Sequence, residues 1–146
     1  MSTALAKAAV SLTTGLEDPE KVTVAMLVAV GAAEQGRSTM IFLTKEAVRL
    51  SVAGTALGTA CAGCPPLPEL YTRYAQAGGR FLICPICFAA KGLDSATTID
   101  TADLGGGAQL LGAFLDPFFK RALQFIQARD HAVKVDGQRA DFIGGQ

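Results

Sequence analysis

This 146-residue chain has no excess charge of one sign, no long apolar run and only one histidine, His131. Thirteen basic residues balance thirteen acidic ones and are scattered along the chain. We therefore expect neither direct nucleic-acid binding nor a charged helix on a membrane surface. The longest strongly apolar stretch, residues 22–33, lies between Lys21 and Glu34. It is too short to span a bilayer, which needs roughly 20 apolar residues, so we expect no membrane association.

The N-terminal region has a single lysine, Lys7, and no apolar run of the signal-peptide type, so we expect a cytoplasmic protein. A chain of 146 residues fits one domain and can bury a core without disulfides or metal. Half of its residues are hydrophobic, and its mean hydropathy is +0.34. A monomer of this size cannot hide so much apolar surface, which predicts an oligomer.

Short apolar runs alternate along the chain with capped, helix-like segments. We predict strands at residues 7–12, 37–43, 80–83, 109–112 and 131–135, and helices at 19–35, 45–52, 67–77, 85–91 and from 117. This alternation predicts one α/β domain over residues 1–135, with a mostly parallel sheet of about five strands and helices on both faces. A tail follows at 136–146. Sites in such folds lie at the carboxyl ends of the strands.

The segment of the first predicted helix carries conflicting signals. Residues 21–36 are rich in Val and Thr, which favours a strand. The Asp18-Pro19 start, the length and the terminal Gly36 favour a helix, and we predict a helix. It is apolar nearly all round, so it needs a second partner besides its own sheet.

The segment FLICPICFAAKGL, residues 81–93, places Cys84 at the end of a predicted strand and Pro85 at the start of a helix. Backbone N–H groups and the positive end of the helix dipole stabilise a thiolate there, which predicts a nucleophilic Cys84. Cys87 lies one turn further on, as a second, resolving thiol or a space-filling residue. Alternatively, both are small buried hydrophobes or a dithiol redox pair.

A second pair, Cys61 and Cys64, lies in the loop of residues 53–66, and nineteen residues separate Cys64 from Cys84. In a cytosolic chain, cysteines are more often metal ligands, redox groups or nucleophiles than structural disulfides. The spacing matches a zinc site of Cys61, Cys64, Cys84 and Cys87. The alternative is a flexible Ala- and Gly-rich loop that carries two incidental thiols.

The chain resembles the DsrE/DsrF-like family of sulfur-relay proteins over most of residues 5–135. The resemblance rests on TTGLEDPEKVTVAMLVA, IFLTKEAV, PPLPELYTRYAQAGGRFLICPICFAAKGL and GAQLLGAF. It implies a flavodoxin-like α/β domain that assembles into homotrimers or homohexamers. It also implies a cysteine that carries sulfur as a persulfide, and Cys84 matches the active cysteine of the family.

Four further residues are expected at the same pocket. Thr44, Lys45 and Glu46 end the neighbouring strand, where Lys45 steadies the anionic sulfur by its charge, and Pro85 follows the active cysteine. The partners expected are sulfur donor and acceptor proteins or small sulfur compounds, and no cofactor is required. The alternative is a non-enzymatic oligomeric module with the four-cysteine zinc site or a redox-sensing dithiol. We interpret Arg80 and Lys91 as surface charges, and His131 as a structural residue rather than a base.

Overall fold

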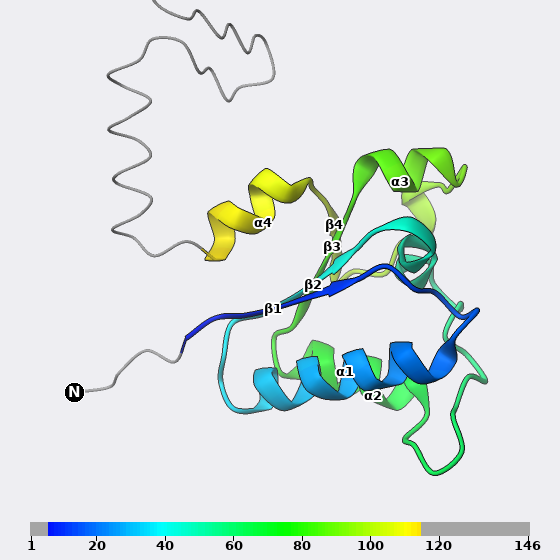
Figure 1. The fold of residues 1–146 in the computed structure, drawn as a ribbon, viewed down its shortest axis with the longest axis vertical. Coiled ribbons are helices and arrows are strands. Elements are labelled where there is room, and N and C mark those ends of the chain that lie inside the picture. The colour runs from blue at the N-terminus through cyan, green and yellow to red at the C-terminus, as the bar shows by residue number, and fades with distance from the viewer. Residues whose placement is uncertain (1–5, 115–146) are drawn as a thin grey trace, which may run out of the picture. The chain divides into compact units, whose positions relative to one another are not determined.

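The structure is a computed structural model, and it describes residues 6–114 of the chain (Figure 1). Four parallel strands form one sheet in the order β1-β2-β3-β4, which confirms the predicted α/β class with four described strands where about five were expected. The strands are β1 Ala8–Leu12, β2 Thr39–Leu43, β3 Arg80–Ile83 and β4 Ala102–Leu104.

The described residues also form four α-helices and two short 3₁₀ helices. The α-helices are α1 Pro19–Glu34, α2 Leu67–Gln76, α3 Pro85–Ala90 and α4 Gly107–Phe114. The 3₁₀ helices are η1 Lys45–Ser51 and η2 Ser95–Thr97. One compact unit ends at Leu110, within α4, and a second begins at Leu111.

One predicted strand is wrong. Residues 109–112 lie within helix α4, and the fourth strand is instead β4, in a segment for which we predicted neither a strand nor a helix. An apolar run of four residues does not distinguish a strand from a helix, whereas β4 has only three residues and is defined by its pairing with β3. The predicted strand at 131–135, the helix from 117 and the boundary at 135/136 lie outside the described residues.

Helix α1 begins as the sequence predicts. The Asp18 carboxylate accepts a hydrogen bond from the backbone N–H of Lys21 at 3.1 Å, and Pro19 occupies the first turn. One face of the helix is buried against the sheet and α2, and it comprises Val22, Met26, Ala29, Val30 and Ala33. The opposite face is exposed and apolar, and it comprises Val24, Leu27 and Val28. The second partner expected for this helix would cover that exposed face.

The core lies between the sheet and helices α1 and α2, which lie side by side below the sheet in Figure 1. Tyr74 of α2 is fully buried, and its hydroxyl donates toward the carbonyls of Thr39 at 3.2 Å and Arg80 at 2.8 Å. It thereby joins α2 to the start of two strands. Gly79 leaves room for the ring, because a Cβ there would lie 2.1 Å from the Tyr74 ring.

The strand order places both of these helices on one face. Each connection moves one strand further in the same direction, and right-handed crossovers then put α1 and α2 on the same side. Helix α3 follows the carboxyl end of β3 and lies beyond that end of the strand, apart from α1 and α2, in Figure 1. The chain thus leaves the sheet at Cys84, and α3 packs against η1.

Candidate functional site: a thiol at the carboxyl edge of the sheet

The carboxyl ends of three neighbouring strands continue their pairing one residue beyond the sheet. The backbone N–H of Thr44 donates to Leu12 O at 3.0 Å, and that of Cys84 donates to Leu43 O at 3.0 Å. Thr44 and Cys84 therefore leave adjacent strands at the same edge. The structure brings together the backbones of these two predicted site residues, as the parallel order requires.

Cys84 is the N-cap residue of α3. Its backbone is extended, with φ −61° and ψ 116°, and Pro85 opens the helix behind it. The Cys84 carbonyl accepts the first helical hydrogen bond from Phe88 N–H at 3.0 Å, and the Phe88 side chain is buried. A proline at the first helical position costs no hydrogen bond, since its missing N–H would have no partner there. The Cys84-Pro85 pair thus fixes the start of the helix at the sulfur.

The Cys84 thiol is free, half-buried and more acidic than an ordinary thiol. Its pKa is lowered first by the backbone N–H of Cys87, and then by the Cys87 thiol and the backbone N–H of Ile86, against an opposing effect of burial. The sulfur makes no capping hydrogen bond of ordinary geometry. The amides therefore act on the thiolate as oriented dipoles rather than through short bonds.

The three residues that follow Cys84 differ in exposure. Cys87 is a free, half-buried thiol whose side chain packs against the hydrophobic core. Ile86 is 80% exposed, and Pro85 is also exposed. The start of α3 therefore exposes a small apolar surface beside Cys84, while Cys87 packs toward the core.

Lys45 follows Thr44 and has an unusual backbone conformation, with φ +51°. Non-glycine residues rarely adopt this left-handed conformation, which costs roughly 1–2 kcal/mol. Its side chain is exposed, and no hydrogen bond caps η1 from the Thr44 side chain. Lys45 thus turns the chain at the edge of the sheet, next to the strand that ends in Cys84.

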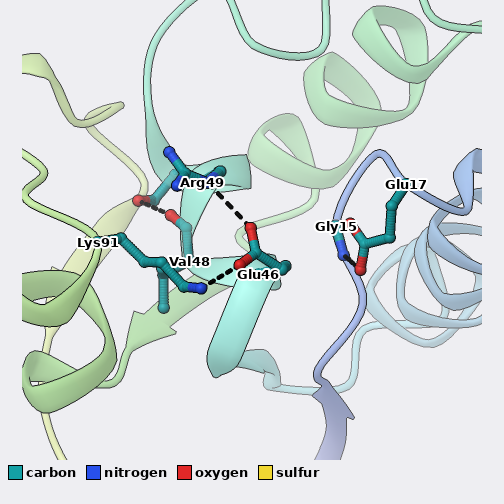
Figure 2. Close-up of polar contacts among 7 residues, drawn as sticks. Gly15, Glu17, Glu46, Val48, Arg49 and Lys91 are labelled. Atoms are coloured by element: carbon teal, nitrogen blue, oxygen red, sulfur yellow. Dashed lines mark hydrogen bonds and ion pairs between the residues drawn. The ribbon is translucent and has the colours of Figure 1, made fainter.

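A cluster of charged side chains links the segments that follow β2 and β3, as Figure 2 shows. The Glu46 carboxylate of η1 accepts a hydrogen bond from Lys91, the C-cap residue of α3, and another from Arg49 Nε at 3.0 Å. These bonds hold the pKa of Glu46 below its ordinary value, with Lys91 as the largest cause. Lys91, interpreted from the sequence as a surface charge, is in fact paired across 45 residues of chain.

The segment after β1 joins the same cluster through its backbone. Gly15 is buried, and a Cβ there would lie 2.8 Å from the Glu46 carbonyl oxygen. The Glu17 carboxylate accepts the Gly15 N–H at 2.9 Å (Figure 2). The sequence did not predict the contact between Gly15 and Glu46 or the pairing of Glu46 with Lys91. Only the spacing of Glu46 and Arg49 along one helix gave a local signal.

The Cys61–Cys64 pair corrects two expectations. These cysteines form a disulfide with a Cα–Cα distance of 5.2 Å, and they are neither incidental thiols nor metal ligands. A tight turn brings them together, in which Cys64 N–H donates to Cys61 O at 3.1 Å and Gly63 adopts φ +76°. With two of its four sulfurs bonded to each other, the predicted four-cysteine zinc site is not formed.

Within residues 6–114, no three His, Cys, Asp or Glu side chains lie together in a way that could hold a metal ion. His131 lies outside the described residues. A hollow of about 420 Å³ lies over the first turns of α1, and none of the predicted site residues lines it. In the same part of the chain, no helix is both long and apolar enough to cross a membrane.

These features define an α/β protein with a parallel sheet and an acidic thiol at its carboxyl edge. The structure is similar to the crystal structure of the ychN protein from E. coli, a protein of DsrE/DsrF-like fold, with a TM-score of 0.62 and 16% sequence identity. The match covers 74% of this chain and 91% of that one. No family model and no curated protein sequence matches the chain. The similarity supports the flavodoxin-like, DsrE-like fold that the resemblance implies.

Proposed function

We propose that this protein is a sulfur-relay protein that carries sulfur as a persulfide on Cys84. The observation that carries the proposal is the state of this thiol, which is free, partly exposed and lowered in pKa at the start of α3. A thiolate is the form of cysteine that attacks sulfur, and access to solvent lets a donor approach it. The DsrE-like fold is consistent with this chemistry.

The loading step needs no oxidant or reductant. The Cys84 thiolate attacks the outer sulfur of a donor persulfide, R–S–SH, so that one S–S bond forms while the donor S–S bond breaks. The donor leaves as the thiolate R–S⁻, and Cys84 holds the –S–SH group. An acceptor thiolate then attacks the outer sulfur in the same way and regenerates the Cys84 thiolate.

Two neighbours have proposed roles in this cycle. Lys45 offers an exposed ammonium group at the adjacent strand end, where its charge steadies the anionic outer sulfur. Cys87 is the second thiol, one helical turn from Cys84, and it interacts with the Cys84 sulfur through both its side chain and its N–H. Thr44 and Pro85 shape the backbone on either side of the sulfur.

We also propose that the protein works in the cytoplasm as a homotrimer or homohexamer, with sulfur donor and acceptor proteins as partners. The exposed apolar face of α1 supports self-association, because Val24 is 55% and Val28 60% exposed on a helix that is otherwise apolar. The exposed Ile86 beside Cys84 supports a docking contact with a relay partner.

The experiment is persulfide loading followed by intact-mass measurement. Wild-type protein incubated with glutathione persulfide gains about 32 Da, one sulfur atom, without added reductant. The gain disappears in Cys84→Ser and persists in Cys87→Ser. If Cys84→Ser keeps the adduct and Cys87→Ser loses it, the active thiol has been assigned to the wrong cysteine.

A redox-sensing module remains the second candidate, and the Cys61–Cys64 disulfide is the observation that favours it. A reversible pair in an exposed turn exchanges with cellular dithiols without any role for Cys84. The loading experiment separates the two proposals, since a pure redox module takes up no sulfur at Cys84.

A further inference from the structure

Three segments that follow neighbouring strands meet at one residue of η1, Glu46. Its carboxylate binds Lys91 at the end of α3, and its backbone carbonyl lies against Gly15 in the segment after β1. Its second carboxylate oxygen binds Arg49 of the same 3₁₀ helix. Glu46 therefore has a fixed backbone position and a fixed side-chain direction (Figure 2).

Helix α3 needs such an external contact. It has six residues, and isolated helices of that length are not stable in water because helix nucleation is unfavourable. Phe88 is buried in the core, Cys87 packs against it, and the C-cap residue Lys91 binds Glu46. Cys84 and Lys91 cap opposite ends of the helix. A contact that holds Lys91 therefore also sets the direction in which the first-turn amides point at the sulfur.

The contribution of this ion pair to global stability is small. The Lys91 and Glu46 side chains are 30% and 39% exposed, and partly exposed pairs are worth little because solvent screens them. The Arg73–Glu34 pair between α1 and α2 has two hydrogen bonds of 2.9 Å and similar exposure. It offers a matched comparison, since it joins helices that do not carry the thiol.

We propose that Glu46 is a positioning residue for Cys84, acting through Lys91 to hold α3 so that its first-turn N–H groups face the sulfur. This inference rests on the proposed role of Cys84 as the reacting thiol. Glu46 does not touch the sulfur in this arrangement. Its effect is transmitted through the short helix, and Gly15 and Arg49 keep the carboxylate in place.

Whether Cys84 reacts faster or more slowly after Glu46 is removed distinguishes a positioning role from a direct effect of the Glu46 charge. The charged groups on α3 and on η1, which packs against it, are Lys45, Glu46, Arg49 and Lys91, and Cys87 is the neighbouring thiol. Glu46 is the only anion among them. If it acted on Cys84 by charge alone, removing it would stabilise the thiolate and speed its reactions. If Glu46 positions α3, its removal weakens the effect of the amide dipoles on the sulfur. The thiolate is then less stable, and its reactions become slower.

The test is the pH profile of Cys84 alkylation by iodoacetamide, read by mass spectrometry with the Cys61–Cys64 disulfide intact. In Glu46→Gln we expect the rate at pH 7 to fall roughly two- to fivefold and the midpoint of the profile to move to higher pH. Lys91→Met gives a similar fall, and Lys91→Arg restores the rate. The double variant Glu46→Gln/Lys91→Met reacts no more slowly than either single one, because both remove the same contact.

Glu34→Gln is the matched control, because it removes one charge from an ion pair remote from α3 and leaves the profile unchanged. An unchanged or faster rate in Glu46→Gln overturns the proposal, as does an equal fall in Glu34→Gln. Urea unfolding of each variant verifies that the fold is retained. Alkylation needs no sulfur donor, so a shifted profile in a protein that takes up no persulfide supports the positioning role while the proposed function fails.

Discussion

The two Cys-x-x-Cys segments of this chain have the same spacing, yet Cys61 and Cys64 form a disulfide whereas Cys84 and Cys87 are free thiols. The first pair lies in an irregular loop, and the second spans the junction of a strand and a helix. Spacing brings two sulfurs near each other in both segments. The backbone around each pair decides what the sulfurs then do.

The disulfide segment is a closed turn. Gly63 adopts a left-handed conformation that glycine tolerates without strain, and the turn hydrogen bond joins Cys64 N–H to Cys61 O. In the other segment, Pro85 directs the chain into a helix, and the amides of Ile86 and Cys87 favour the Cys84 thiolate. Stabilising the thiolate stabilises the reduced form of a pair, so this backbone favours the reduced form of the second pair.

The largest difference expected between the segments is in chemical reactivity. Iodoacetamide added to native protein without reductant at pH 7 modifies Cys84 first, Cys87 about tenfold more slowly, and neither Cys61 nor Cys64. Because the pKa of Cys84 is lowered in the folded state, its rate falls as the pH drops through that pKa. The midpoint lies below that of the same cysteine in urea. Peptide mapping identifies the modified residues. A midpoint that is equal in native and unfolded protein would contradict a lowered pKa of Cys84 in the folded state.

The same shift makes stability depend on pH. A lowered pKa in the folded state means that ionised Cys84 contributes stability above its unfolded pKa. That contribution is lost as the pH falls through the folded pKa. Wild type should therefore gain stability relative to Cys84→Ser between neutral and alkaline pH, when the two are compared by urea unfolding.

Removal of the disulfide tests the other segment. The variant Cys61→Ala/Cys64→Ala loses the cross-link of a four-residue loop, which by the chain-entropy relation lowers the free energy of unfolding by about 2 kcal/mol. Reducing the wild type should give the same loss in urea unfolding. Cys84→Ala is the control, because it keeps the Cys61–Cys64 cross-link and should lose the same free energy on reduction as the wild type, whereas Cys61→Ala/Cys64→Ala should not respond to reductant. Identical unfolding of oxidised and reduced wild type would contradict a stabilising disulfide.

Short sequence patterns predicted those parts of the site that depend on contacts between neighbouring residues in the chain. Asp18-Pro19 and Cys84-Pro85 are cap-and-proline starts, and both helices begin there. The Val- and Thr-rich composition of α1 was overridden by its cap and by burial of one face. The end of α2 before Gly78 was equally predictable, since that glycine has φ +80°.

The features that were missed depend on contacts between distant parts of the chain. Strand β4 exists because it pairs with β3, and the Glu46–Lys91 pair joins residues 45 positions apart. The Cys61–Cys64 disulfide was missed for another reason. An expectation about the redox compartment outweighed the turn-forming Ala-Gly between the two cysteines, which was visible in the sequence.

The smallest expected effect concerns the glycine in the disulfide turn. Gly63→Ala introduces a Cβ that meets no atom within 4 Å, so its cost comes from the left-handed backbone alone and is about 1 kcal/mol. Gly63→Asn should cost less, because asparagine tolerates this conformation. In reduced protein the turn can relax, and the cost of Gly63→Ala should shrink.

Gly58→Ala provides the matched control for that measurement. Gly58 has φ +75° in the same loop, and a Cβ there also meets nothing within 4 Å, but it lies outside the disulfide turn. Its cost in urea unfolding should therefore be the same with and without reductant. If Gly63→Ala and Gly58→Ala respond to reductant equally, the left-handed turn at residue 63 is held by the loop as a whole. The backbone difference between the two cysteine pairs would then not originate in the turn itself.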